Sequence, residues 1–376
     1  MPSHDRLRLA FLGDPNSVHT RRWLSWFAEH EHDVHLLEGF GAEIAPGLDT
    51  RIQVQRYDAF GRLRGPLVSS LHARGELRRL LERIRPQVLH AHFVRRHGWQ
   101  GWLAGFHPFV VSPWGSDLLK VRRHALRTRW WNRRALRGAD LVTTSTDYLR
   151  AAAIAAGARP NRIEVVQHGV DTGRFSPGAP PDGLARRLGV ADRAAVIFSP
   201  RAIRPLYQHE TVIDAFADLP GGPILLMSAA GANLPYLAAI REQIRARGVV
   251  GRVRIVDEIA HGEMPAFMRL ARVVVSVPES DSFPVSLLEA MAGATPVIAS
   301  DLPPTRAVLE PIAPAALVPV GDVAALTAAL RRAIALTDHE RRQVGETLRR
   351  YVVQAADYEA NMARMEGLYR RLARRA

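Results

Sequence analysis

The sequence contains no cysteine and only one lysine, Lys120, among its 376 residues. The absence of cysteine excludes disulfides, thiolate catalysis and cysteine-ligated metal sites. Because 51 residues are Lys or Arg, arginine carries nearly all of the positive charge, which indicates a compositional bias toward arginine. The formal net charge of +14 nevertheless favours contact with polyanions such as membrane surfaces, nucleic acid and diphosphates.

Long hydrophobic runs are also missing. The longest candidate, residues 99–111, is interrupted by Gln100, Gly101, Gly105, His107 and Pro108, whereas a membrane-spanning helix needs about 20 apolar residues. Residues 1–6 are polar and lead directly into an apolar stretch, which argues against a signal peptide. We therefore expect a cytoplasmic protein. Its length exceeds that of one compact core and predicts two domains.

Short apolar runs alternate with amphipathic stretches along most of the chain, which is typical of repeated βα units. A Pro- and Gly-rich stretch, residues 176–182, interrupts this alternation and is interpreted as a linker. Residues 351–375 are predicted to form one long amphipathic helix. Two similar α/β halves predict two Rossmann-like domains that face a central cleft, with the active site in that cleft.

The segment from Pro278 to Asp301 has the strongest functional pattern. A polar turn follows a predicted strand at residues 273–277, and a predicted helix begins after it at residue 286. Such a unit directs backbone N–H groups and the positive end of a helix dipole toward an anion such as a phosphate or diphosphate. Asp281 and Glu289 supply carboxylates that can accept hydrogen bonds from sugar and ribose hydroxyls.

This segment resembles the donor-binding signature of the retaining GT-B glycosyltransferases of family 4 (group 1). Their pattern has two acidic residues separated by seven others, then Ala-Met-Ala, Gly and Pro-Val. The present chain has Asp281 and Glu289, then Ala-Met-Ala at 290–292, Gly293 and Pro-Val at 296–297. His168-Gly169-Val170-Asp171 is similar to the family's interdomain stretch.

The resemblance implies a GT-B fold whose C-terminal helix crosses back to the first domain. Residues 1–172, with 355–376, would form the Rossmann-like acceptor-binding domain, and residues 173–354 the nucleotide-sugar-binding domain. It also implies the donor contacts. Glu289 would bind the ribose and Asp281, where the family usually has Glu, the transferred sugar. The turn and the base site would be formed by Ser282, Phe283, Pro284 and Ile259.

The predicted phosphate clamp departs from the family pattern. Arg201 matches an arginine that neutralises the diphosphate, a role suited to bidentate Arg–phosphate contact. The family's lysine six positions later is Tyr207 in this chain. Arg204 could supply the second charge and Tyr207 a hydroxyl donor. The alternatives are a weakened donor site and, for Arg204, a surface arginine without a ligand.

The first turn, residues 13–21, is predicted to line the acceptor side through Gly13, Asn16 and His19. His90 and His92 end a predicted strand and point to one face. The His-x-His pattern could bind a metal, but no third ligand is evident and the resembling enzymes generally need none. At least one of these histidines could instead be packed, and His92 remains an acceptor-side candidate.

Trp114-Gly115-Ser116-Asp117 resembles the family's His-Gly-x-Asp, whose histidine contacts the transferred sugar. Trp114 can stack on a sugar and donate through its N–H, but it cannot exchange a proton near neutral pH. Asp117 is retained and is predicted to accept a hydrogen bond from a hydroxyl. We therefore group Asp117 with Arg201 and Asp281 as catalytic candidates.

The stretch from Lys120 to Arg137 carries eight basic residues, no acidic residue, and the pair Trp130 and Trp131. This composition suits a helix lying on anionic lipid. It would equally suit a phosphorylated acceptor, or a solvated helix whose tryptophans pack inward. Nucleic acid is not expected as a partner, because no nucleic-acid-binding motif accompanies the charge.

We therefore expect an NDP-sugar-dependent glycosyltransferase, with UDP- or GDP-linked donors, a hydroxyl acceptor and retention of anomeric configuration. The expected setting is glycan, glycolipid or glycoconjugate biosynthesis on the cytoplasmic side, with peripheral attachment to the inner membrane face left open. No cofactor and no metal are expected. Trp114 and Tyr207 leave two alternatives, a catalytically weakened nucleotide-sugar-binding protein and a protein that mainly binds polyanions or membranes.

Overall fold

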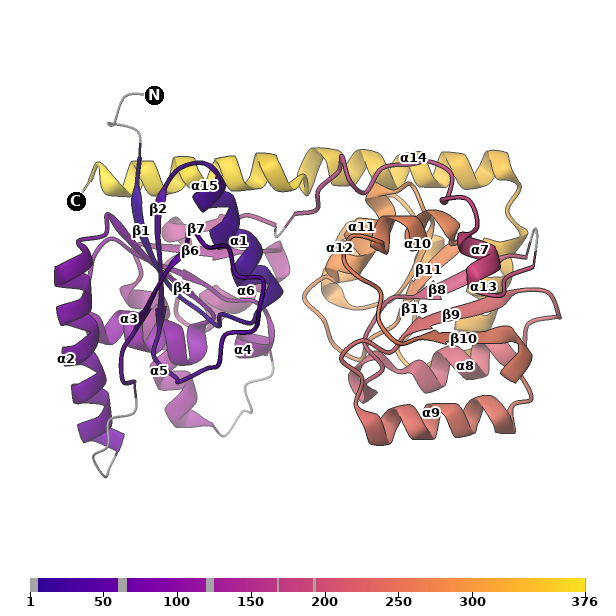
Figure 1. The fold of residues 1–376 in the computed structure, drawn as a ribbon, viewed down its shortest axis with the longest axis horizontal. Coiled ribbons are helices and arrows are strands. Elements are labelled where there is room, and N and C mark those ends of the chain that lie inside the picture. Colours follow the sequence, from indigo (N-terminus) through magenta and orange to yellow (C-terminus); the bar gives the residue numbers. More distant parts are fainter. Residues whose placement is uncertain (1–5, 60–65, 120–124, 168, 192–193, 376) are drawn as a thin grey trace. The chain divides into compact units, whose positions relative to one another are not determined.

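The computed structural model describes residues 6–59, 66–119, 125–167, 169–191 and 194–375. The chain divides into two compact units, unit 1 with residues 1–168 and 360–376, and unit 2 with residues 169–359. Each is built around one parallel sheet (Figure 1). The boundaries expected from the sequence lay after residues 172 and 354. The Pro-rich stretch 176–182 that we interpreted as a linker lies inside unit 2.

Unit 1 contains a seven-stranded sheet in the order β3-β2-β1-β4-β5-β6-β7, in which every paired strand is parallel. The chain builds β1 to β3 in one direction and β4 to β7 in the other, so the winding reverses between β1 and β4. The strands are β1 (Arg8–Leu12), β2 (Asp33–Glu38), β3 (Gln53–Arg56), β4 (Val88–His92), β5 (Phe109–Ser112), β6 (Leu141–Thr144) and β7 (Ile163–Val165).

Alternating side chains on these strands pack against helices on both faces of the sheet. Ala10 and Leu12 of β1 contribute to the core beneath α2, α5 and α6. Phe11 points to the opposite face, where it meets Phe27 of α1 and Tyr369 of α15. The helices of unit 1 are α1 (Val18–Glu29), α2 (Pro66–Ile84), α3 (Trp99–Ala104), α4 (Ser116–Leu119), α5 (Leu126–Gly138), α6 (Asp147–Ala155) and α15 (Tyr358–Ala373).

The C-terminal helix α15 is part of the core of unit 1. Tyr369 is fully buried, its hydroxyl lies within hydrogen-bonding distance of His90, and it accepts a hydrogen bond from Trp23 Nε1 at 3.2 Å. The expectation of one helix over residues 351–375 is wrong, because the helix is interrupted at Ala356 and Asp357. There Val170 N donates to Ala356 O at 2.9 Å and Tyr358 N donates to Val170 O at 3.0 Å. This strand-like pairing takes backbone groups that a continuous helix would use.

Unit 2 contains a six-stranded parallel sheet in the order β10-β9-β8-β11-β12-β13, so its winding reverses between β8 and β11. The strands are β8 (Val196–Ser199), β9 (Ile224–Ser228), β10 (Val253–Val256), β11 (Val273–Ser276), β12 (Val297–Ser300) and β13 (Leu317–Val318). Helices α8 (His209–Ala217), α9 (Leu234–Ala246) and α13 (Val323–Ala335) pack on one face. The other face carries α7 (Leu184–Arg187), α10 (Met264–Leu270), α11 (Val285–Ala292), α12 (Pro303–Leu309) and α14 (Asp338–Ala355).

Helix α14 approaches the end of α11 through Gly345. A Cβ atom at this position would lie 2.1 Å from the carbonyl oxygen of Ala294, a backbone atom that no side-chain rotation can move. We expect Gly345→Ala to lower the free energy of unfolding by about 1–3 kcal/mol, because overpacking outweighs the gain in helix propensity. Gly367→Ala in α15 is the matched control. The nearest atom to its Cβ is a flexible Arg371 nitrogen at 3.8 Å, and that variant is expected to be neutral or slightly stabilised. Urea denaturation of both variants checks this, and equal stabilities would contradict the close packing.

Candidate functional site

In unit 2, Arg201 and Asp281 meet beyond the carboxyl ends of the neighbouring strands β8 and β11. Arg201 Nη2 lies 2.9 Å from Asp281 Oδ2, and both side chains are largely buried, with 17% and 15% of their surface exposed. The guanidinium carbon of Arg201 lies 4.1 Å from the centre of the Tyr207 ring. This place is the winding reversal of the sheet, where open α/β sheets bind their ligands.

The polar turn between β11 and α11, residues 279–284, is called the donor turn. The carboxylate of Asp281 closes it through hydrogen bonds. Asp281 Oδ1 accepts hydrogen bonds from Ser282 N at 2.7 Å and Phe283 N at 3.4 Å. The two amides and the guanidinium that we predicted to face a donor therefore converge on Asp281 in this conformation. An anion entering the turn would compete with Asp281 for the same three hydrogen-bond donors.

The other residues predicted to contact the sugar-nucleotide donor differ in their exposure. Pro284 is buried and immediately precedes α11, and Glu289 lies on that helix with 8% of its surface exposed. Ile259 is packed in the core, so only its main chain is available to a base. Arg204 is exposed and its Nε donates to Gly231 O at 2.7 Å, which anchors it to the loop between β9 and α9.

His209 was not predicted from the sequence as a site residue. It contacts the main chain of Arg201. This side chain is fully buried at the start of α8, and its Nε2 lies 3.2 Å from Arg201 O. Burial lowers the pKa of His209 to about 4, so the ring is neutral. Because a carbonyl oxygen only accepts, Nε2 carries the hydrogen and holds Arg201 in place. A histidine two residues after Tyr207 has no sequence signal that distinguishes it from a surface histidine.

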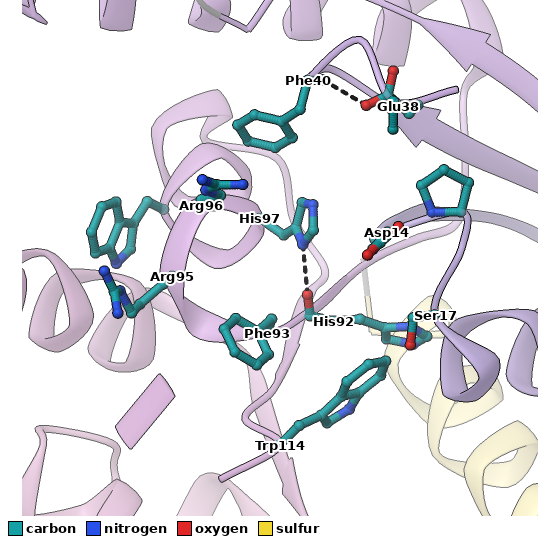
Figure 2. Close-up of a pocket in the computed structure, with 14 residues that line it drawn as sticks. Asp14, Ser17, Glu38, Phe40, His92, Phe93, Arg95, Arg96, His97 and Trp114 are labelled. Atoms are coloured by element: carbon teal, nitrogen blue, oxygen red, sulfur yellow. Dashed lines mark hydrogen bonds between the residues drawn. The ribbon is translucent and has the colours of Figure 1, made fainter. Parts of the chain in front are cut away.

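Unit 1 has a pocket of about 730 Å³ at its own winding reversal, between β1 and β4 (Figure 2). Gly13 and Asp14 follow β1, His97 follows β4, Phe40 follows β2 and Trp114 follows β5. Parallel strands bring the loops at their carboxyl ends to one edge, which explains why residues far apart in sequence line one cavity. The pocket is therefore the candidate site of this unit.

The structure gathers three of the five predicted acceptor-side residues at this pocket, namely Gly13, His92 and Trp114. Asn16 and His19 do not line it. The Asn16 amide is engaged elsewhere, since its Nδ2 donates to Glu43 O at 2.7 Å and its Oδ1 accepts from Ala45 N at 2.9 Å. The His19 ring meets Trp114 edge-on, with 5.6 Å between ring centres.

Asp117 requires a correction. We predicted that it accepts a hydrogen bond from a substrate hydroxyl, but its side chain is fully buried. Its Oδ2 accepts from Val94 N at 2.8 Å, and its Oδ1 accepts from Trp114 N at 3.1 Å and Gly115 N at 3.0 Å. Burial raises the pKa of Asp117, while the amide hydrogen bonds oppose that rise. Asp117 ties together two loops that line the pocket, and none of its surface is exposed in this structure.

The two strand-end histidines are both buried. The ring nitrogens of His90 are occupied by the Tyr369 hydroxyl and by Ser112 Oγ, at 2.7 Å for the latter, and burial lowers the pKa of His90 to about 3. His90 is thus the packed histidine of the pair. Among the described residues, no group of three His, Asp or Glu side chains is arranged to hold a metal ion.

The basic stretch is partly described. Lys120, Arg122 and Arg123 lie outside the described residues, while Arg127 to Arg137 lie on α5. Trp131 packs inward, with its ring centre 5.9 Å from Trp99 and 5.7 Å from Trp102. Trp130 is 47% exposed and carries the guanidinium of Arg134 at 4.9 Å from its ring centre. Trp131 therefore packs against Trp99 and Trp102, whereas Trp130 lies at the surface.

No helix in the described parts of the chain is both long and apolar enough to cross a membrane.

Comparison with known families agrees with the fold. Residues 181–350 match the model of the group 1 glycosyl transferases, and residues 8–146 match that of the glycosyl transferase 4-like family. These two ranges cover most of the chain. They include the Arg201–Asp281 ion pair and the residues that line the unit 1 pocket. The chain belongs to the group 1 glycosyltransferases with the GT-B fold.

Solved structures share this fold across the chain. Sucrose-phosphate synthase of Thermosynechococcus elongatus superposes with a TM-score of 0.82 at 18% identity, covering 99% of this chain and 100% of that chain. Alr3699/HepE of Anabaena, solved in complex with UDP, gives 0.81 at 18% identity, covering 97% and 100%. These likenesses confirm the two Rossmann-like domains expected from the sequence.

Sequence relatives match over a shorter range. The D-inositol 3-phosphate glycosyltransferase of Jonesia denitrificans is 31% identical over 157 residues, which is 39% of this chain and 37% of that protein. The protein of the same name in Mycobacterium bovis BCG (Pasteur 1173P2) is 32% identical over 164 residues, or 43% and 33%. The matches thus span well under half of these relatives.

Proposed function

We propose that this protein transfers a sugar from an NDP-sugar, UDP- or GDP-linked, to a hydroxyl acceptor in glycan, glycolipid or glycoconjugate biosynthesis. The observation that carries the proposal is the position of Arg201, a largely buried cation at the winding reversal of unit 2 with the donor turn beside it. A departing diphosphate gains most from a preorganised positive group in a partly desolvated place. Anabaena HepE, solved with UDP and with UDP-glucose, supports a nucleotide-sugar donor.

The unit 1 pocket is the proposed acceptor site. Its aromatic walls, Phe40 and Trp114, suit the apolar faces of a sugar or polyol ring, and its loops offer polar groups for hydroxyls. The names of the relatives, which specify an inositol phosphate, support a hydroxylated cyclic acceptor. Asp117 holds the loops in place, and we do not assign it a step in the reaction.

Retention of configuration and independence of metal and cofactor are further parts of the proposal. In the step we propose, the acceptor oxygen bonds to the anomeric carbon on the face that the diphosphate leaves. The bond from that carbon to the phosphate oxygen breaks, and the hydroxyl proton passes to the departing diphosphate. The anomeric coupling constant of the product, measured by NMR, tests retention. Full activity after EDTA treatment would support metal independence, and activity restored only by a divalent cation would contradict it.

The competing function is a nucleotide-sugar-binding protein with weakened catalysis. Two observations favour it, the stacking of Tyr207 against Arg201 and the closure of the donor turn by Asp281. A transfer assay with a panel of UDP- and GDP-sugars separates the two functions. Acceptor-dependent release of nucleoside diphosphate supports the transferase. Binding of a donor without release, for every acceptor tried, supports the binding protein.

We also propose peripheral attachment to the inner face of the cytoplasmic membrane through α5. Replacing Arg127, Arg133 and Arg134 with glutamate is expected to weaken binding to phosphatidylglycerol vesicles by 100-fold or more, since each arginine near an anionic surface contributes about 1 kcal/mol. In the matched control, glutamate replaces three exposed arginines of unit 2, Arg241, Arg332 and Arg342. Vesicle flotation measures both. Equal losses in the two variants would show that only net charge matters, and would contradict a docking face on α5.

A further inference from the structure

His97 has one ring nitrogen that is fixed and one that is open. Its Nδ1 lies 2.9 Å from the main-chain oxygen of His92. Because a carbonyl oxygen only accepts hydrogen bonds, Nδ1 carries the hydrogen, and the neutral ring then has a lone pair at Nε2. The hydrogen bond to His92 therefore determines the tautomer and makes Nε2 a hydrogen-bond acceptor.

The acceptor nitrogen of His97 faces the pocket. Figure 2 shows the second ring nitrogen on the side away from the His92 oxygen, toward the space between Phe40 and Asp14. The Phe40 ring meets His97 edge-on at 5.3 Å between ring centres. Among the described residues, nothing hydrogen-bonds to Nε2, and this atom is not among the buried polar atoms that lack a partner. It is open to a ligand in the pocket.

The backbone around His97 is held in an unfavourable conformation. Phe93 has φ 81° and Arg96 has φ 64°, the left-handed region that residues with a side chain rarely adopt. The irregular turn Val94–Gly98 is kept there by Gly98 N, which donates to Phe93 O at 3.0 Å, and by the bond from Val94 N to Asp117. Such strain persists where the surrounding structure enforces it, and it is concentrated at functional sites.

Burial keeps the His97 ring neutral, although most of the charges near it act in the opposite direction. Burial lowers the pKa of His97, and Arg96 lowers it further, while the bond to His92 O and the charges of Asp14 and Glu38 oppose the change. The two carboxylates are themselves engaged. Asp14 Oδ1 accepts from Asn16 N at 2.8 Å, and Glu38 accepts from Phe40 N at 2.7 Å and Gly41 N at 3.1 Å. His97 Nε2 is thus a neutral acceptor on the pocket wall with no other hydrogen bond to break.

We propose that His97 binds the attacking hydroxyl of the acceptor through Nε2 and thereby determines which hydroxyl receives the sugar. The inference rests on the proposed function, in which this pocket holds the acceptor. His97 orients the hydroxyl before transfer and does not take its proton. As the new bond forms, the single O–H hydrogen turns from Nε2 to an oxygen of the departing diphosphate and leaves with it. Trp114, which stands where the resembling family has histidine, offers only an N–H donor and cannot supply this contact.

Two substitutions separate this role from a structural one. In His97→Asn the amide nitrogen replaces Nδ1 and preserves the bond to His92 O, but nothing replaces Nε2. In His97→Gln the terminal amide lies near the position of Nε2 and its oxygen can accept from a hydroxyl. If His97 serves the acceptor, kcat/KM for the acceptor falls about 5- to 50-fold in His97→Asn and is largely rescued in His97→Gln. If His97 serves only the loop, the order of the two variants reverses.

The measurements are steady-state transfer kinetics, UDP affinity and the melting temperature of both variants, and calorimetric binding of D-inositol 3-phosphate and related polyols without donor. We expect unchanged UDP affinity and melting temperature, and weaker polyol binding in His97→Asn alone. Transfer by the wild type together with normal acceptor kinetics in His97→Asn would overturn the inference and leave the proposed function intact. Absence of transfer by the wild type would overturn the proposed function. The polyol calorimetry would then decide the role of His97, with equal binding by wild type and His97→Asn counting against it.

Discussion

Arg201→Ala is expected to lower the rate of sugar transfer by about 100- to 1,000-fold, the usual effect of removing one preorganised group that stabilises developing negative charge. The loss follows from the position of the side chain. It is held by Asp281 at 2.9 Å and stacked on Tyr207, and His209 fixes its main-chain oxygen, so the guanidinium is preorganised. Arg201→Lys should recover little, because an ammonium group lacks the bidentate geometry and the stacking surface.

Arg204→Ala is the matched control for this prediction. Arg204 is exposed and bonded to Gly231, and its loss should cost much less than that of Arg201. Single-turnover transfer with saturating donor separates the effect on the chemical step from the effect on binding. Equal losses for the two variants would mean that the diphosphate does not use Arg201 in the way proposed. It would also mean that Arg204 moves on donor binding.

Asp117→Ala is expected to destabilise unit 1 by about 2–5 kcal/mol. The substitution leaves the buried amides of Val94 and Gly115 and the partly buried amide of Trp114 without an acceptor, and each unsatisfied buried donor costs about 1–3 kcal/mol. Part of this is offset because the carboxylate itself is costly to bury. Since two loops of the pocket lose their common anchor, acceptor binding should fail before global unfolding.

Hydrogen exchange at these three amides, with chemical denaturation, measures the effect. Asp117→Asn provides the comparison, because the amide oxygen can still accept from one loop while its NH₂ group faces the other amides. We expect its stability to lie between those of wild type and Asp117→Ala. If the three amides exchanged as slowly in Asp117→Ala as in the wild type, the carboxylate would not be the anchor of the loops.

The sequence predicted most of what depends on local pattern. The alternation of apolar runs located most of the strands. The resemblance of the Asp281–Glu289 segment to the family's signature located the donor turn at the end of β11. Arg201 was identified by resemblance, because it stands just beyond a predicted strand where the family has its diphosphate-binding arginine. Since both residues follow neighbouring strands, their meeting at 2.9 Å could be expected once the order β8-β11 was known.

What the sequence did not predict depends on contacts between distant segments. Asp117 and Asn16 look like exposed polar residues in Gly-containing turns, and only the folded loops show that backbone groups occupy their side chains. The break at residues 356–357 arises from pairing with Val170, nearly 200 residues away, which no helical periodicity reports. His97 had a weak signal, since it ends a run of basic residues just after a strand end.

Binding of nucleoside diphosphates and NDP-sugars tests the central claim most directly. Wild type and Arg201→Ala are compared by thermal shift with UDP, GDP and their glucosylated forms. At a ligand concentration of about 100 times Kd the stabilisation is about 2.7 kcal/mol, a rise on the order of 5 °C in Tm for a domain of this size. We predict such a rise for at least one nucleotide in the wild type and its loss in Arg201→Ala. No shift of the wild type with any of these nucleotides, or an equal shift in both proteins, would contradict a donor site at Arg201.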